Sequence, residues 1–273
     1  MPTLPPGRPG RLAGNEPHTQ RNVAQSYGAD VERYDRTRPR YPDALVRRVV
    51  AAGPGRDVLD VGAGTGIAGL AFQAAGCTVL GVEPDPRMAA FARRKGLEVE
   101  VATFEDWDPA GRTFDVLIAG TAWHWVDPVA GAAAAARTLR PGGRPALFWN
   151  AFDPVPEVAD AFGAVYARVL PDSPVYQRAM AGPASHASVL DRASDGLRRS
   201  GAFGGFEQWH IGWDRHYTRE EWLDQVPTFG GHGQLPPGRL EALLDGIGDA
   251  VDSLGGAFTM HYTTLVLTCV RAS

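Results

Sequence analysis

Short runs of consecutive apolar residues alternate with helical stretches between Asp57 and Asn150. Runs such as V-L-D-V and V-L-I-A lack the strict polar alternation of a half-exposed strand, so they predict strands that are covered on both faces. The stretches between them carry apolar residues at helical spacing and end near glycine or proline. This pattern predicts βαβ units in a parallel sheet enclosed by helices. Strands are expected over residues 57–61, 78–82, 97–101, 114–119 and 144–150, with helices over 67–75, 85–95 and 129–139.

The regular alternation of predicted strands and helices ends after Asn150. Helical patterns cover residues 158–170 and 189–200, and two strands of alternating character are expected over 206–213 and 258–271. We expect these strands to complete the sheet and the inserted helices, within about 151–202 and 216–256, to form a cap. The prediction is a single domain over residues 21–273 with a cofactor-binding core over 43–150. A lead-in rich in proline and glycine, residues 1–20, is expected to be disordered.

The amino-acid composition argues against several classes of function. Hydrophobic residues make up 44% and charged residues 21% of the chain, as in an ordinary globular protein. The net charge of −4 argues against a nucleic-acid binder, and no apolar run is long enough to span a membrane. The N-terminus has no hydrophobic signal segment, and Cys77 and Cys269 lie far apart, so we expect a cytoplasmic protein. No cysteine and histidine cluster has metal-ligand spacing, so no metal is predicted.

The strongest motif is V-L-D-V-G-A-G-T-G, residues 58–66, between a predicted strand and a predicted helix. Its glycines allow a tight turn and a close approach of backbone N–H groups to a ligand. The dinucleotide fingerprint would place glycine where Ile67 stands, and the shifted match that begins at Gly64 starts too late after the strand. The carboxyl group of Asp60 suits a ligand that carries an amino group better than one that carries a pyrophosphate. These features disfavour a nicotinamide-dependent oxidoreductase.

Glu83 ends the second predicted strand, about twenty residues after the glycine motif. A carboxylate at this position accepts hydrogen bonds from both hydroxyls of a ribose. The alternative is a helix-capping or solvated acid, but the spacing favours the ribose role.

Four motifs in the same order and spacing resemble the class I S-adenosylmethionine-dependent methyltransferases. They are V-L-D-V-G-A-G-T-G, V-E-P-D, F-D-V-L-I-A and L-R-P-G-G-R-P-A-L-F-W, and the branch they look most like includes trans-aconitate-type and ubiquinone/menaquinone-type enzymes. The resemblance implies a Rossmann-like α/β fold with seven strands in the order 3-2-1-4-5-7-6 and an antiparallel last strand. It also implies S-adenosylmethionine as cofactor and S-adenosylhomocysteine as product.

The resemblance assigns roles to matched positions around that cofactor. The glycine loop and its acid would line the methionine part, and the residues after the fourth strand would meet it from the other side. Glu83 would take the ribose, and Pro84 or Asp85 would lie near the adenine. The residues after the third strand would flank the adenine, although the usual pair of an acid and an alanine is absent there. The implied positions are Asp60, Gly62, Ala63, Gly64, Gly66, Glu83, Pro84, Phe104, Glu105, Thr121 and Ala122.

The segment S-Y-G-A-D-V-E-R-Y-D-R-T-R-P-R-Y-P also looks like the lead-in of the trans-aconitate-type branch. There an aromatic residue and an arginine approach the cofactor, and Tyr34 and Arg38 are the matching positions. An arginine facing the methionine carboxylate makes physical sense. A purely structural N-terminal helix is the alternative.

Residues for the acceptor are expected at the carboxyl ends of strands four and five, where ligands bind in such sheets. His124 is the candidate catalytic base or substrate contact, because oxygen acceptors of high pKa usually need a base. The alternative is that His124 caps the next helix while its neighbours Trp123 and Trp125 fill core space. Two more histidines, His210 and His261, lie in the late strands and are weaker candidates for the cap side. The predicted substrate contacts are Trp123, Trp125, Trp149 and Asn150.

These observations predict a methyltransferase that acts on a small molecule, with oxygen as the leading acceptor atom. Nitrogen, carbon and carboxylate acceptors stay open. The Arg-, Ala-, Gly- and Pro-rich composition with almost no lysine is typical of a high-GC bacterial gene and suggests secondary metabolism. The alternative is a protein that binds S-adenosylmethionine without methyl transfer, either as a regulatory partner or as a cyclase or rearrangement enzyme.

Overall fold

A computed structural model describes residues 17–19, 24, 26–171 and 182–273. Seven strands form one sheet in the order β3-β2-β1-β4-β5-β7-β6. β7 runs antiparallel to both of its neighbours, and the other neighbouring strands pair in parallel. The implied strand order and the antiparallel last strand are therefore confirmed. The strands are β1 (Asp57–Val61), β2 (Thr78–Val82), β3 (Glu98–Glu100), β4 (Phe114–Gly120), β5 (Leu139–Phe152), β6 (Phe203–Thr218) and β7 (Ala257–Arg271).

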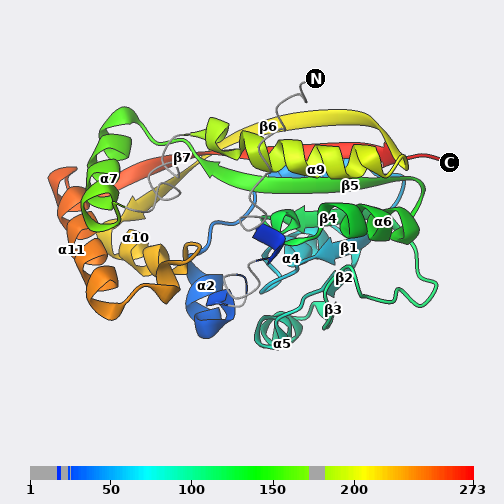
Figure 1. Cartoon of the computed structure of the whole chain (residues 1–273), viewed down its shortest axis with the longest axis horizontal. Helices are drawn as coiled ribbons and strands as arrows, with labels where there is room; N and C mark the ends of the chain where they lie inside the picture. The colour runs from blue at the N-terminus through cyan, green and yellow to red at the C-terminus, as the bar shows by residue number, and fades with distance from the viewer. Residues whose placement is uncertain (1–16, 20–23, 25, 172–181) are drawn as a thin grey trace, which may run out of the picture.

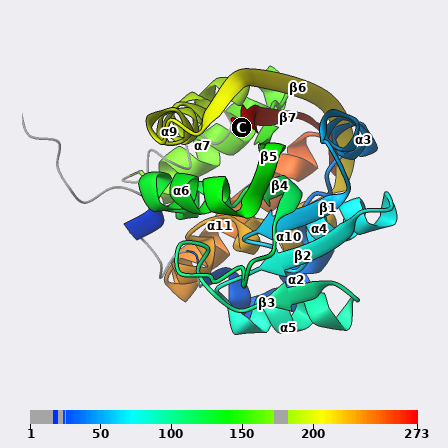
Figure 2. The ribbon, with the colours of Figure 1, turned by 90° about the vertical axis from the view of Figure 1, so that its right-hand side faces the viewer.

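Helices cover both faces of the sheet, as the unbroken apolar strands predicted. Successive side chains of a strand point to opposite faces, so Leu117 packs toward α6 and α9, whereas Val116 and Ile118 pack toward α3 and α4. Figure 2 shows α6 and α9 on one side of the strands and α3 on the other. The helices concerned are α3 (Asp43–Ala52), α4 (Ile67–Ala74), α5 (Pro86–Arg94), α6 (Pro128–Thr138) and α9 (Ala187–Arg199).

A third core lies at one end of the sheet, where β5, β6 and β7 extend past the parallel strands (Figure 1). There the ring of Phe162 stacks on that of Trp222, with centroids 5.5 Å apart. Tyr217 and Phe258 from the strand extensions pack around Trp222. This cap is built from α7 (Pro156–Val169), α10 (Arg219–Gln225), η5 (Val226–Thr228), η6 (His232–Gln234) and α11 (Pro237–Ser253).

The boundary of the predicted cap is wrong at one element. α9 falls inside the insertion expected over 151–202, yet its buried residues Leu190, Ala193 and Leu197 pack on the sheet beside α6. Its apolar stripe matches the sheet face, which would otherwise stay uncovered next to β5 and β7. Within the described part of that insertion, the cap therefore consists of α7, with η4 (Pro183–His186) leading into α9.

β5 also differs from its prediction, because it begins at Leu139 rather than after the Pro-Gly-Gly turn. Leu139 pairs with Phe114, and the pairing then shifts so that Arg144 faces Val116. The turn residues 141–143 are thus taken into the strand as an irregularity.

Most of the predicted lead-in, residues 1–20, lies outside the described residues; residues 17–19 form a short 3-10 helix, η1 (Pro17–Thr19). The single-domain boundaries stay a prediction. In the part of the chain that the structure describes, no helix has the length and apolar character that crossing a bilayer requires.

Candidate cofactor and acceptor site

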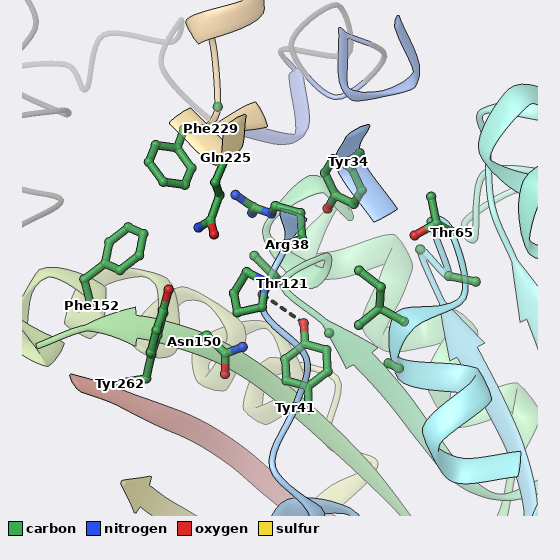
Figure 3. A pocket seen from close by; sticks show the side chains of 18 of the residues that line it. Tyr34, Arg38, Tyr41, Thr65, Thr121, Asn150, Phe152, Gln225, Phe229 and Tyr262 are labelled. Carbon is green, nitrogen blue, oxygen red and sulfur yellow. Dashed lines mark hydrogen bonds between the residues drawn. The ribbon is translucent and has the colours of Figure 1, made fainter. Parts of the chain in front are cut away.

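Two adjoining cavities lie at the carboxyl ends of β1, β2, β4 and β5, the edge at which ligands bind in such sheets. The first, of about 280 Å³, opens between the glycine loop and the cap, and we term it the cap cavity (Figure 3). The second, of about 290 Å³, contains Glu83, Asp85 and Glu105, and we term it the acidic cavity. The residues common to both are Tyr34, Arg38, Gly62, Gly64, Gly120 and Thr121.

The glycine loop lies between the two cavities. Gly62 and Gly64 adopt φ values of 67° and 55°, in the left-handed region that favours glycine. A Cβ atom on Gly62 would stand 2.6 Å from the Cβ of Ala122, so a side chain does not fit there. Gly66 was expected beside the cofactor, but it lines neither cavity. It precedes α4 and packs against Leu97.

Asp60 lies beneath the loop with its side chain fully buried, and it lines the cap cavity. Neither carboxyl oxygen makes a hydrogen bond of full geometry among the described residues, although the backbone N–H of Gly69 lies close enough to lower the pKa of this group. Burial raises the pKa of Asp60 to about 7, and the neighbouring carboxyl of Glu83 adds to the rise. A buried acid without a partner is costly in a folded protein, so this group is a strong candidate for binding a cation.

Glu83 joins the glycine loop to the end of β2. Its carboxyl oxygens accept hydrogen bonds from the backbone N–H of Gly64 at 2.8 Å and of Asp85 at 2.9 Å. Burial raises the pKa of Glu83 to about 7 although both N–H donors lower it. Pro84 and Asp85 follow it along the wall of the acidic cavity, where Asp85 also caps α5.

Phe104 and Glu105 line the same cavity from the segment after β3. The ring of Phe104 is 97% buried and lies 6.0 Å from that of Trp123. Glu105 accepts a hydrogen bond from the backbone N–H of Asp127 at 2.8 Å, which fixes the start of α6. The acid therefore has a structural role in addition to its place at the cavity wall.

Thr121 directly follows β4 and lines both cavities. It has φ of 54°, a strained conformation for a β-branched residue, and its N–H donates to Phe148 at 2.7 Å. Its hydroxyl lies 3.1 Å from that of Tyr41, as the dashed line in Figure 3 shows. Ala122 follows at the wall of the acidic cavity. Such strain is typical of functional sites.

His124 lies in η3 (Trp123–Trp125) and lines the acidic cavity. Its Nδ1 accepts a hydrogen bond from Trp149 Nε1 at 3.2 Å, so the neutral ring carries its proton on Nε2. Burial lowers the pKa of His124 to about 3. A ring with its free lone pair occupied and a low pKa is a poor general base. Because the ring lines the acidic cavity and not the cap cavity, a contact with a ligand in the acidic cavity fits it better than a base role.

The predicted substrate contacts are divided among three environments. Trp123 and Trp149 are 97% and 99% buried and fill the sheet core, so they line neither cavity. Trp125 lines the acidic cavity, with its ring 6.3 Å from that of Tyr27. Asn150 alone among these four reaches the cap cavity. The tryptophan prediction is thus corrected for two residues, because apolar rings next to a sheet are buried in its core.

A chain of hydrogen bonds orients the side chain of Asn150. Trp213 Nε1 donates to Thr264 Oγ1 at 2.9 Å, and Thr264 in turn donates to Asn150 Oδ1 at 2.7 Å. Thr264 is fully buried. Because the amide oxygen is occupied, the N–H₂ group is the part of Asn150 left to face the cavity.

Residues 58–143 match the model of a family described as a methyltransferase domain. This match covers the glycine loop, Glu83 and His124, and it agrees with the strand order 3-2-1-4-5-7-6. The chain contains a class I methyltransferase domain.

Relatives by sequence agree with this assignment. An uncharacterized methyltransferase of Mycobacterium tuberculosis is 38% identical over 138 residues, which cover 50% of this chain and 56% of that protein. A ribosomal protein L11 methyltransferase of Xanthomonas axonopodis is 36% identical over 98 residues, 34% of this chain and 31% of that protein. The chain thus matches little more than half the length of the mycobacterial relative.

Two solved structures share the fold of this methyltransferase domain. A protein of Anaeromyxobacter dehalogenans assigned as a type II methyltransferase has a TM-score of 0.58 at 23% identity, covering 85% of this chain and 97% of that one. The YcgJ protein of Bacillus subtilis has a TM-score of 0.51 at 18% identity, covering 85% and 98%.

The cap side of the candidate site contains residues that no motif predicted. They come from the segment before α3, from β5, α7, η4, the end of α10, the segment after η5, η6 and β7. Among these elements, only β7 carried a sequence signal that could have found a cavity residue. Successive side chains of a strand point to opposite faces, so His261 and Tyr262 had to lie on different sides of the sheet. His261 and His210, the sequence candidates, lie outside the cavity, where His261 contacts Asp214. The unpredicted cavity residues are Tyr41, Phe152, Tyr166, His186, Gln225, Phe229, His232 and Tyr262.

Metal ligation finds no support in the described residues. Within the ranges that the structure covers, no group of three or more histidine, cysteine, aspartate or glutamate side chains is arranged to hold an ion.

Proposed function

We propose that this protein transfers a methyl group from S-adenosylmethionine to a small-molecule acceptor, with an oxygen as the acceptor atom. The observation that carries the proposal is the pair of buried carboxyls, Asp60 and Glu83, on either side of a glycine loop that joins two cavities. One cavity has the residues for a nucleoside and the other has room for a second molecule.

The residues present fit this cofactor. Asp60, whose buried oxygens make no hydrogen bond of full geometry, would hold the ammonium of the methionine part, and Gly62 leaves room for the ligand to approach the backbone. Glu83 would accept the ribose hydroxyls, as acids at this position of the fold do. The adenine would lie along Pro84 and Phe104. The other proposed contacts are Ala63, Gly64, Asp85, Glu105, Thr121 and Ala122, with Tyr34 and Arg38 near the methionine carboxylate.

The chain contributes alignment and the exclusion of water. When bound, S-adenosylmethionine supplies a methyl group on a positively charged sulfur, ready for in-line displacement. The aromatic walls of the cap cavity keep water from this point, and Asn150 offers N–H groups that orient an oxygen of the acceptor. His124 donates through Nε2 rather than accepting a proton. A place in bacterial secondary metabolism stays a prediction.

Calorimetric titration of the purified protein with S-adenosylmethionine and S-adenosylhomocysteine tests the cofactor. We expect binding that falls by at least about 30-fold in Glu83→Ala, since hydrogen bonds to a charged group contribute roughly 1.5–3 kcal/mol each. The matched control is Glu98→Ala, on the exposed side of β3, which should bind like the wild type. Absence of binding in folded wild-type protein would refute the proposal.

Transfer itself needs a second measurement. Release of S-adenosylhomocysteine on addition of candidate acceptors distinguishes a transferase from a protein that only binds the cofactor. Cofactor binding without release for any acceptor that itself binds would favour the non-transferring alternative.

A further inference from the structure

The cap cavity has an unusual distribution of charge. Among the described residues that line it, the only charged side chains are Arg38 and Asp60, and Asp60 lies beneath the glycine loop. His232 and His186 also line it, but burial lowers the pKa of His232 to about 4 and lowers that of His186, so both are neutral near pH 7. The half of the cavity next to the cap therefore has a cation and no carboxylate.

Arg38 differs from its arginine neighbours on the same segment. Arg36 pairs with Asp224 at 2.7 Å, and Arg40 pairs with Asp35 at 3.3 Å. The Arg38 guanidinium has no carboxylate partner in the part of the chain that the structure describes. It lies 5.3 Å from the ring centre of Tyr34 and 5.8 Å from that of Phe229. An inward cation without a carboxylate partner is available to an anionic ligand.

A buried amide stands next to this guanidinium. Gln225 is the last residue of α10, is fully buried and lines the cavity. It lies near the hydroxyls of Tyr217 and Tyr262, yet neither amide atom makes a hydrogen bond of full geometry. Figure 3 shows the Arg38 guanidinium directed toward Gln225, on the cap side. Buried amides are normally satisfied, so the missing partner indicates a ligand.

The walls next to these polar groups are aromatic. Phe152 and Phe229 face the cavity with ring centres 5.5 Å apart, and Tyr262 lies 5.5 Å from Phe152. Trp213 stacks on the other face of Tyr262 at 4.3 Å and holds its ring plane. Rigid rings of this kind favour a flat apolar ligand.

We propose that the acceptor is a planar aromatic carboxylate, bound between the aromatic walls with its carboxylate held by Arg38 and the amide of Gln225. The proposal rests on the proposed methyltransferase function and names the substrate class of that site. A cationic acceptor is disfavoured in the cap half, because the Arg38 guanidinium repels it and no carboxylate among the described lining residues there offsets its charge. Arg38 has five N–H donors, enough to serve the methionine carboxylate on one edge and the acceptor on the other.

Three probes of the same shape and different charge test this proposal: 4-hydroxybenzoate, 4-hydroxybenzamide and 4-hydroxybenzamidinium. Each is titrated by calorimetry into protein already saturated with S-adenosylhomocysteine. We expect the anion to bind at least about tenfold more tightly than the neutral amide, and the cation to bind most weakly. A preference for the amide or the amidinium, or no binding of any probe, would overturn the substrate class.

Substitutions at position 38 locate the effect. In Arg38→Gln the preference for the anion should vanish, and in Arg38→Lys part of it should return. The control is Arg47→Gln on the exposed face of α3, which should keep the full preference. Failure of the wild type to bind S-adenosylhomocysteine would instead count against the proposed function, so the two failures are distinguishable.

Discussion

The acidic cavity and the cap cavity share the glycine loop and Thr121 but are built in different ways. The residues of the acidic cavity lie mainly in short segments that follow consecutive parallel strands, with a carboxyl group at Glu83. The cap cavity is lined by residues such as Asn150, Gln225 and Tyr262, which come from an extended strand, a cap helix and the antiparallel strand. The acidic cavity is formed by segments that follow neighbouring strands of the parallel core. The cap cavity exists only after the cap has packed against the sheet.

The difference in charge has a functional consequence. The carboxyls beside the glycine loop suit ribose hydroxyls and an ammonium, whereas the cation at Arg38 suits an anion. Arg38 lines both cavities and Asp60 lines the cap cavity, so the contrast lies between the glycine-loop side, with its carboxyls, and the cap side, where Arg38 has no carboxylate beside it. Experiments on these residues test the difference between the two sides of the site, and the largest effect is expected at Asp60.

Asp60→Asn should weaken S-adenosylmethionine binding by at least about 30-fold, since removing one member of a buried charge pair costs roughly 2–5 kcal/mol. The same change should raise the thermal stability of the ligand-free protein near pH 8, because a buried charge without a partner is removed. Calorimetry and a melting curve measure the two effects. Equal cofactor affinity in the variant would show that the ammonium binds elsewhere.

Cofactor affinity should depend on pH through both carboxyls. The pKa values of Asp60 and Glu83 are raised to about 7, from usual values of 3.8 and 4.5. The bound form needs ionised carboxylates, so affinity is full above about pH 7 and falls by about tenfold per pH unit and group below it. In the ligand-free protein the sign is opposite, because the destabilising charge is absent below about pH 4 and full above about pH 7. Titrations between about pH 5.5 and pH 8.5 test this, and a flat profile contradicts it.

Gly62→Ala should lower the stability by about 1–2 kcal/mol from the left-handed backbone alone, with a further cost from contact with Ala122. Cofactor binding should weaken as the loop shifts. The comparison is Gly163→Ala in α7, where a new Cβ meets nothing within 4 Å and helical backbone favours alanine by roughly 0.5–1 kcal/mol. Denaturant unfolding compares the two, and an unaffected Gly62→Ala would show that the loop tolerates side chains.

Gln225→Leu should stabilise the ligand-free protein slightly, by about 1 kcal/mol, since a buried amide without a hydrogen bond costs roughly that much. Cofactor binding should stay at the wild-type level, and 4-hydroxybenzoate should bind more weakly. Melting curves with and without each ligand give all three results. Loss of stability would mean that the amide is satisfied within the protein.

The acceptor half of the site shows where sequence reasoning was insufficient. Trp123 and Trp149 were expected at the acceptor because they follow strand ends, but a residue at a strand end points either toward a ligand or into the packed face of the sheet. His124 was a candidate base or substrate contact, and the choice depends on its tautomer, which is set by Trp149, whose indole reaches it only in the folded chain. Gln225 and Phe229 belong to no motif, since their role arises from the position of α10 relative to β5.

The sequence alone determined the parallel core, the glycine loop, Asp60 and Glu83, because strands, turns and the residues that end them depend on local apolar periodicity and on backbone conformations that few residues tolerate. The resemblance also predicted the order of the seven strands, which the structure confirms. Tertiary structure decided that α9 covers the sheet rather than the cap, that Asn150 presents its N–H groups, and that Arg38 faces a cavity without acids beside the cap. These features depend on contacts between segments far apart in the sequence, such as Asn150 with Thr264, and periodicity along the chain carries no information on such contacts.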